Sequence, residues 1–135
     1  MAHQLNDERV RDHRQITVAD WCERAFGKEQ AASVQQRCLR LLEESIEAYQ
    51  AVGCDEQTAI DLVRYVFSRP KGELRQEIGG IGLVLLSVAQ AAGLSAEAEE
   101  CREIDRVLAK PLEHFTKRNQ EKNDAGFLVT GLEEK

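Results

Sequence analysis

Three glutamates, Glu43, Glu44 and Glu47, form the pattern E-E-x-x-E in a segment whose apolar residues recur every three or four positions. This recurrence predicts an amphipathic helix, and a turn of about 100° per residue places the three carboxylates on one side of it. Adjacent carboxylates repel one another, so a bound divalent cation is one physical reason to gather them. The alternative interpretation is an ordinary solvated helical face.

A second acidic segment, GELRQEIGGIG, places Glu73 and Glu77 one helical turn apart, just before Gly79, Gly80 and Gly82. Glycines inside a helix cost about 1 kcal/mol each relative to alanine, a cost usually tolerated where another backbone or a ligand comes close. Carboxylates from this segment and from E-E-x-x-E together would make a hard oxygen site. Such a site suits Mg²⁺ or Mn²⁺ rather than zinc.

Aromatic and basic residues provide two further candidates for binding. Trp21 and Phe26 lie on one apolar stripe, and they either pack the core or line a pocket for a flat ligand. The basic residues Lys117, Arg118 and Lys122 stand near the end of a predicted helix, where cations are commonly solvated and favoured by the helix dipole.

Helix signals divide the chain into segments that would position these residues. Three N-caps and three glycine stops set most of the boundaries: Thr17, Asp55 and Ser95, and Gly27, Gly53 and Gly93. The predicted helices cover about residues 17–26, 30 or 33 to 52, 55–67, 72–92, and 95 onward, with a kink or restart at Pro111. The third of them should bury Ile60, Val63, Val66 and Phe67. No segment has a β-strand pattern, so the sequence predicts an all-α, antiparallel bundle of four to five helices.

Length and charge indicate one domain and exclude some partners. We expect a flexible arm at 1–16, a helical domain at 17–123 and a tail at 124–135. The net charge of −6 argues against a nucleic-acid polymer, whose phosphates are held by clustered lysine and arginine. The polar start and the absence of an apolar run of about 20 residues predict a cytoplasmic protein without a membrane partner.

The order of these motifs resembles a known family. The chain reads R-C-L-R-L-L-E-E-S-I-E-A-Y-Q-A-V-G, then a helix, then G-E-L-R-Q-E-I-G-G-I-G-L-V-L-L and A-A-G-L. From Trp21 to Asn123 this is similar to the MazG-like all-α nucleoside triphosphate pyrophosphohydrolases. The resemblance implies cleavage of a (deoxy)nucleoside triphosphate to the monophosphate and pyrophosphate, with two or more Mg²⁺ or Mn²⁺ ions. It also implies a homodimer or homotetramer.

The resemblance assigns roles to the acidic residues. Glu44 and Glu47 match metal ligands of the first motif, and Glu77 matches the glutamate of the second. Glu43 matches the remaining acid and becomes the candidate catalytic base for an attacking water. The departure from the pattern is Gly80, which stands where the family has an aspartate, so a cation is lost or another group replaces that ligand.

The resemblance also suggests how a nucleotide would bind. R-N-Q-E-K-N is similar to a segment that contacts nucleotide in relatives, which would give Arg118, Asn119 and Lys122 a phosphate role. Trp21 and Phe26 would lie beside the base. The E-x-G-G form is similar to a phage-associated, MazZ-like branch that acts on purine deoxynucleotides such as dGTP. The alternatives are a nucleotide-binding relative without catalysis and a purely structural helical bundle.

Overall fold

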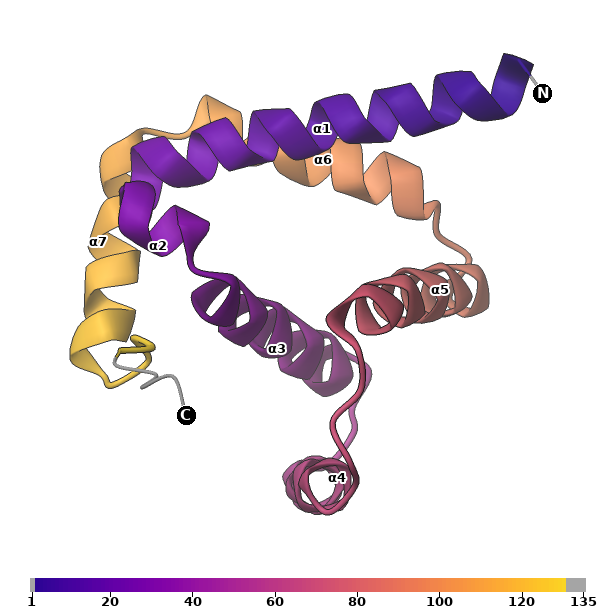
Figure 1. The fold of residues 1–135 in the computed structure, drawn as a ribbon, viewed down its shortest axis with the longest axis vertical. Helices are drawn as coiled ribbons and strands as arrows, with labels where there is room; N and C mark the ends of the chain where they lie inside the picture. The colour runs from indigo at the N-terminus through magenta and orange to yellow at the C-terminus, as the bar shows by residue number, and fades with distance from the viewer. Residues whose placement is uncertain (1, 131–135) are drawn as a thin grey trace. The chain divides into compact units, whose positions relative to one another are not determined.

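The computed structural model describes the backbone of residues 2–130 and the side chains of residues 10–130. Within that range the chain is all-helical, with seven helices and no strand (Figure 1). The helices are α1 Ala2–Phe26, α2 Lys28–Ala32, α3 Val34–Ala51, α4 Glu56–Phe67, α5 Leu74–Ala92, α6 Ala96–Ala109 and α7 Leu112–Asp124. The all-α prediction is therefore confirmed for the described part of the chain.

Most helix ends follow the predicted local signals. Asp55 caps α4 by accepting a hydrogen bond from the Thr58 backbone N–H at 2.9 Å, and the Ser95 hydroxyl accepts one from Ala98 N–H at 3.1 Å. Gly27 and Gly93 have positive φ angles of 84° and 70°, which a glycine adopts without strain. These boundaries were predictable because each depends on only a few neighbouring residues.

The predicted start of the first helix at Thr17 is wrong. Helix α1 already begins at Ala2, and Thr17 lies inside it, with its hydroxyl donating to the His13 carbonyl oxygen at 3.0 Å. A threonine inside a helix can bond back one turn in this way, so its presence alone does not mark a start. The predicted tail is described only as far as Thr130, and residues 1 and 131–135 lie outside the described residues.

The chain divides into two compact units, each of which is described by itself. Unit 1 comprises the described residues of Met1–Glu43 and Val107–Lys135, and unit 2 comprises Glu44–Arg106. In unit 1, α1 packs against both α2 and α7 (Figure 1). Its small core contains Cys22 and Ala25, and the Thr116 hydroxyl from α7 donates to the Ala25 carbonyl oxygen at 2.9 Å.

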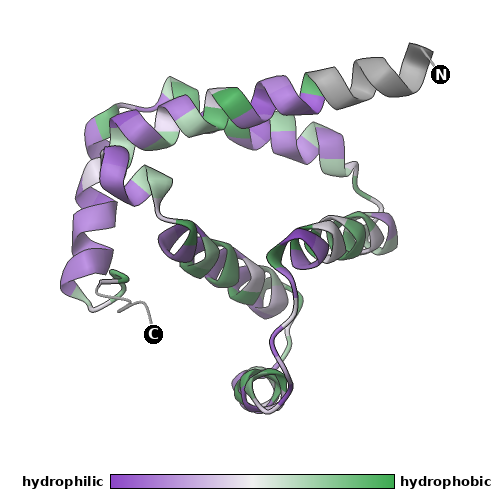
Figure 2. Cartoon of the chain, viewed as in Figure 1, coloured by the Kyte–Doolittle hydropathy of each residue, from purple (hydrophilic) through white to green (hydrophobic). Residues whose placement is uncertain are grey.

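Unit 2 contains no buried residue. Its helices α4 and α5 are rich in apolar residues, as the hydropathy colouring shows (Figure 2), yet these side chains are exposed. The predicted buried face of α4 is therefore wrong for this chain by itself: Ile60, Val63, Val66 and Phe67 are between 37% and 86% exposed. The apolar period indicated the helix correctly, but unit 2 holds no second apolar surface packed against that face.

In the described part of the chain, no single helix has both the length and the apolar composition to cross a membrane. One bent pair of helices, α5 with α6, meets those two criteria when its members are taken together.

Candidate functional site

Glu44 and Glu47 lie on consecutive turns of α3, in the part that belongs to unit 2, and both are exposed. Glu77 lies in the first turn of α5, also in unit 2. A side chain at Gly72 would collide with Oε1 of Glu77, so the Glu77 carboxylate lies against the Gly72 backbone. Among the described residues, no group of three His, Cys, Asp or Glu side chains is arranged to hold a metal ion. The predicted ligands have the right oxygen chemistry for Mg²⁺ or Mn²⁺, but they are not gathered around one point.

Gly80 is helical and has open space around it. A Cβ built at Gly80 meets no atom within 4 Å, and the same holds at Gly79 and Gly82. The sequence predicted that another backbone or a ligand would come close to these glycines, and no other backbone does so within the described residues. The first side-chain carbon of an aspartate, the residue that the resembling family has at position 80, would therefore meet no clash.

Glu43 lies in unit 1, where both of its carboxylate oxygens are in ion pairs. Lys122 Nζ on α7 lies 2.7 Å from Oε1, and Arg40 Nη1 donates to Oε2 at 3.1 Å. Partial burial acts to raise the pKa of Glu43, but the hydrogen bonds and charges of Lys122 and Arg40 outweigh it and lower the pKa. In this arrangement Glu43 ties α3 to α7 and is a weak proton acceptor, because a carboxylate of low pKa holds a proton poorly.

The two aromatic residues singled out in the sequence contact each other in unit 1. Trp21 meets Phe26 edge to face, with ring centroids 5.2 Å apart, and meets Phe115 of α7 in the same way at 5.0 Å. All three rings are half-buried. The cluster packs α1 against α7, yet the Trp21 indole N–H is shielded from solvent and has no hydrogen-bond partner in the described structure.

The three polar residues predicted on α7 differ in their surroundings. Asn119 is buried, and its side-chain amide donates to Gln30 Oε1 at 2.9 Å. Lys122 is half-buried against Glu43. Arg118 is exposed. The structure therefore brings Asn119 and Lys122 into unit 1 together with Trp21, Phe26 and Glu43, and it leaves Arg118 at the surface of α7.

Two arginines that the sequence reasoning did not select complete this region. The guanidinium of Arg37 lies over the Phe26 ring, 5.0 Å from its centroid, and Arg40 stands one turn later on α3. Arg37 follows Val34 by three residues and precedes Leu41 by four, so it stands on the apolar stripe of its helix. A charged arginine on the apolar side of a helix was the signal in the sequence that could have identified this region as a candidate binding site.

Gln36 was missed as well, and no local pattern could have revealed it. It is only 1% exposed, and its amide donates to the Phe127 carbonyl oxygen at 3.1 Å and accepts from the Val129 backbone N–H at 2.8 Å. These bonds hold the segment after α7 against α3. Its partners lie more than 90 residues along the chain.

Comparison of this chain with protein families, with curated proteins and with solved structures finds no match.

Proposed function

We propose that this protein is a metal-dependent nucleotide pyrophosphohydrolase of the MazG-like type, which cleaves a purine deoxynucleoside triphosphate such as dGTP between the α- and β-phosphates. The observation that carries the proposal is α3, an uninterrupted helix that bears E-E-x-x-E with Glu44 and Glu47 exposed one turn apart. Two carboxylates with this spacing can share one cation from a single helix.

In this proposal, Glu44, Glu47 and Glu77 hold Mg²⁺ or Mn²⁺, which neutralises the charge of the triphosphate when bound. Glu77 would have to leave the Gly72 backbone to contribute, and its flexible side chain permits that. Glu43 can accept a proton only after an ion pair with Lys122 or Arg40 opens, since both of its oxygens are occupied. Trp21 and Phe26 would contact the base by stacking.

Exposed apolar side chains support the further proposal of a homo-oligomer. Helix α5 is apolar on several sides, and its exposed large apolar residues are Leu74, Ile78, Ile81, Leu83, Val84, Leu85, Leu86 and Val88. A helix with apolar residues all round is normally buried, and a contiguous exposed apolar patch marks an interaction site. We therefore propose that α4 and α5 pair with a second copy of the chain, in a homodimer or a homotetramer located in the cytoplasm.

The decisive experiment incubates the purified protein with each of the four dNTPs in Mg²⁺ or Mn²⁺ and resolves the products. We expect release of pyrophosphate and the monophosphate, faster from dGTP than from dCTP or dTTP. Glu47→Gln should reduce turnover at least 100-fold, while Glu56→Gln, an exposed glutamate on α4, should not change it. Equal turnover of purines and pyrimidines would refute the purine assignment, and full activity of Glu47→Gln would refute the metal assignment.

Two observations favour a second candidate, a protein that binds a nucleotide without cleaving it. Glu43 is engaged by two cations, and Gly80 replaces an acid. Metal-dependent binding of dGTP without any product would support this candidate. Gly80→Asp then tests whether the missing acid prevents cleavage, because a Cβ at position 80 meets no neighbouring atom and the added carboxylate should tighten Mn²⁺ binding. An unchanged Mn²⁺ titration would show that Gly80 is not the missing ligand position.

A further inference from the structure

The side-chain polar atoms that are shielded from solvent and lack a hydrogen-bond partner all belong to unit 1. In the described part of the chain they are Trp21 Nε1, Arg37 Nε, Arg37 Nη2, Arg40 Nη2 and Asn123 Oδ1. The first four are donors and only the last is an acceptor. Because a buried N–H without an acceptor loses its hydration without compensation, this imbalance indicates a missing acceptor.

The missing acceptor should carry negative charge. Arg37 forms no ion pair with the described residues, while Arg40 and Lys122 share the single carboxylate of Glu43. Three cations and one anion leave an excess of two positive charges, in a chain whose net charge is −6. Water could satisfy one N–H, but it supplies no charge to balance the half-buried guanidinium groups of Arg37 and Arg40.

The surroundings of Arg37 hold its guanidinium in a defined orientation. It stacks on Phe26, whose ring in turn meets Trp21 edge to face. The thiol of Cys22 is also close: burial raises the pKa of that thiol, and the charge of Arg37 and its hydrogen bond with the thiol oppose the rise. A thiol is a weak acceptor, and Nε and Nη2 of Arg37 still have no partner among the described residues. A planar donor fork fixed in this way matches two oxygens of a phosphate group.

We propose that Arg37 and Arg40, together with the indole N–H of Trp21, form a metal-independent site for a phosphate-class oxyanion. An excess of two positive charges suits a multiply charged phosphate better than a single carboxylate. The site itself stands on the contacts within unit 1. Its assignment to the polyphosphate of a nucleotide rests on the proposed function. It differs from the earlier expectation, in which Arg118 was one of the phosphate contacts.

The test uses the full-length protein in EDTA and the fluorescence of Trp21, the only tryptophan of the chain. Inorganic pyrophosphate should shift the emission saturably, and it should raise the melting temperature relative to NaCl of the same ionic strength. Malonate should bind at least tenfold more weakly. If pyrophosphate gives neither effect, the site does not exist, whatever the nucleotide assays show. If malonate binds equally well, the phosphate class is wrong.

Two arginines that both stack on aromatic rings provide the matched variants. Arg37 stacks on Phe26 in unit 1, and Arg69 stacks on Tyr65, 5.4 Å from its ring centroid, in unit 2. Arg37→Gln should weaken pyrophosphate at least tenfold, Arg37→Lys should weaken it less, and Arg69→Gln should leave it unchanged. Circular dichroism checks that each variant folds, and if Arg37→Gln does not fold, Arg40→Gln replaces it. Equal binding by the wild type and a folded Arg37→Gln variant would overturn the proposal.

A competition experiment then separates this inference from the proposed function. In EDTA no metal-dependent turnover occurs, so dGTP acts only as a ligand. Displacement of pyrophosphate by dGTP supports assignment of the site to the nucleotide polyphosphate. Binding of pyrophosphate without competition by dGTP would overturn that assignment while leaving the oxyanion site intact.

Discussion

Units 1 and 2 both consist of helices, but their polar side chains bond over different distances along the sequence. In unit 1, polar groups bridge segments far apart in the sequence: Asn119 bonds to Gln30, Lys122 pairs with Glu43, and Gln36 holds the segment after α7. In unit 2, bonds such as Thr58 to Asp55 and Arg106 to Glu103 join residues three apart. Contacts within unit 1 therefore join distant parts of the chain, whereas the large apolar side chains of α4 and α5 in unit 2 are exposed.

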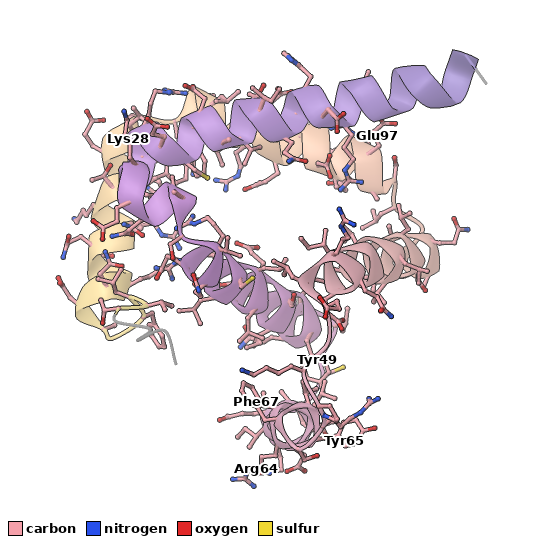
Figure 3. All side chains as sticks on the ribbon, viewed as in Figure 1. Lys28, Tyr49, Arg64, Tyr65, Phe67 and Glu97 are labelled. Atoms are coloured by element: carbon pink, nitrogen blue, oxygen red, sulfur yellow. The ribbon has the colours of Figure 1, made fainter. Side chains whose placement is uncertain are left out.

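The surface of α4 illustrates the difference. Viewed along the helix axis, Arg64, Tyr65 and Phe67 project outward in different directions (Figure 3). Phe67 is 86% exposed. The ring of a phenylalanine contributes to stability mainly when it leaves water, and the homo-oligomer that we propose would supply a surface to cover Phe67.

The largest expected effect tests that explanation. Phe67→Glu should weaken self-association more than 100-fold, because it places an unpaired charge in the proposed interface. Sedimentation velocity over a range of protein concentrations measures it. The matched control is Ile16→Glu on α1 in unit 1, where the isoleucine is 68% exposed.

We expect Ile16→Glu to assemble as the wild type does, and both variants to keep the helical content of the wild type. If the wild-type chain stays monomeric at all concentrations, the proposed interface at α4 does not exist. Equal weakening by the two variants would show that added charge, not the position on α4, is responsible.

The next effect concerns the polar ties of unit 1. Gln36→Leu removes both bonds to the backbone of Phe127 and Val129, and the free energy of unfolding should fall by about 1–3 kcal/mol. Urea denaturation measures that change. Limited proteolysis should also cut more rapidly after Gly126, because the segment is no longer held.

Gln35→Leu is the matched control, since Gln35 is the exposed neighbour on the same helix. It should change the unfolding free energy by less than about 0.5 kcal/mol. If both leucine variants unfold and are digested alike, Gln36 does not hold the segment after α7.

Gln36 and Asp55 also mark how far the sequence could predict the fold. Asp55 caps α4 through a residue three positions away, and Gly93 ends α5 through its own φ angle, so both were visible in short windows. Gln36 bonds to residues that are distant in sequence, and no periodicity encodes that choice. For the same reason the helix that contains Phe67 was predictable, whereas the exposure of Phe67 was not.

In the candidate site, too, the features set by neighbouring residues were predictable and the contacts between distant segments were not. The spacing of Glu44 and Glu47 on one helix was predictable, because it depends only on helical geometry. Convergence of these residues with Glu77 depends on how separate helices meet, and they are not gathered in the described structure. Family resemblance directed attention to Arg118, whereas the arginines with shielded nitrogen atoms in unit 1 are Arg37 and Arg40, which the sequence reasoning did not select.

The smallest expected effect is the loss of stability at low pH, which should differ between the two units. The pKa of Asp55 lies below its ordinary value of 3.8 because the Thr58 backbone N–H and then the Thr58 hydroxyl bond to the carboxylate. The pKa of Glu43 lies below 4.5 despite partial burial, because of Lys122 and Arg40. Each group is more acidic folded than unfolded. Its stabilisation is therefore complete above the unfolded pKa and disappears as the pH falls through the folded pKa.

Acidification below these ordinary values should consequently loosen each unit at a different place. Hydrogen-exchange protection should fall at the Thr58 amide as α4 frays from its start, and the ion pairs of Glu43 should contribute up to about 1 kcal/mol less to unit 1. Asp55→Ser supplies a cap that does not titrate, so it should make protection at Thr58 independent of pH while unit 1 still responds. In Asp55→Ser only the pH dependence of α4 should vanish. If acid still lowers hydrogen-exchange protection equally in both units of that variant, it acts through the net charge of the chain rather than through these two carboxylates.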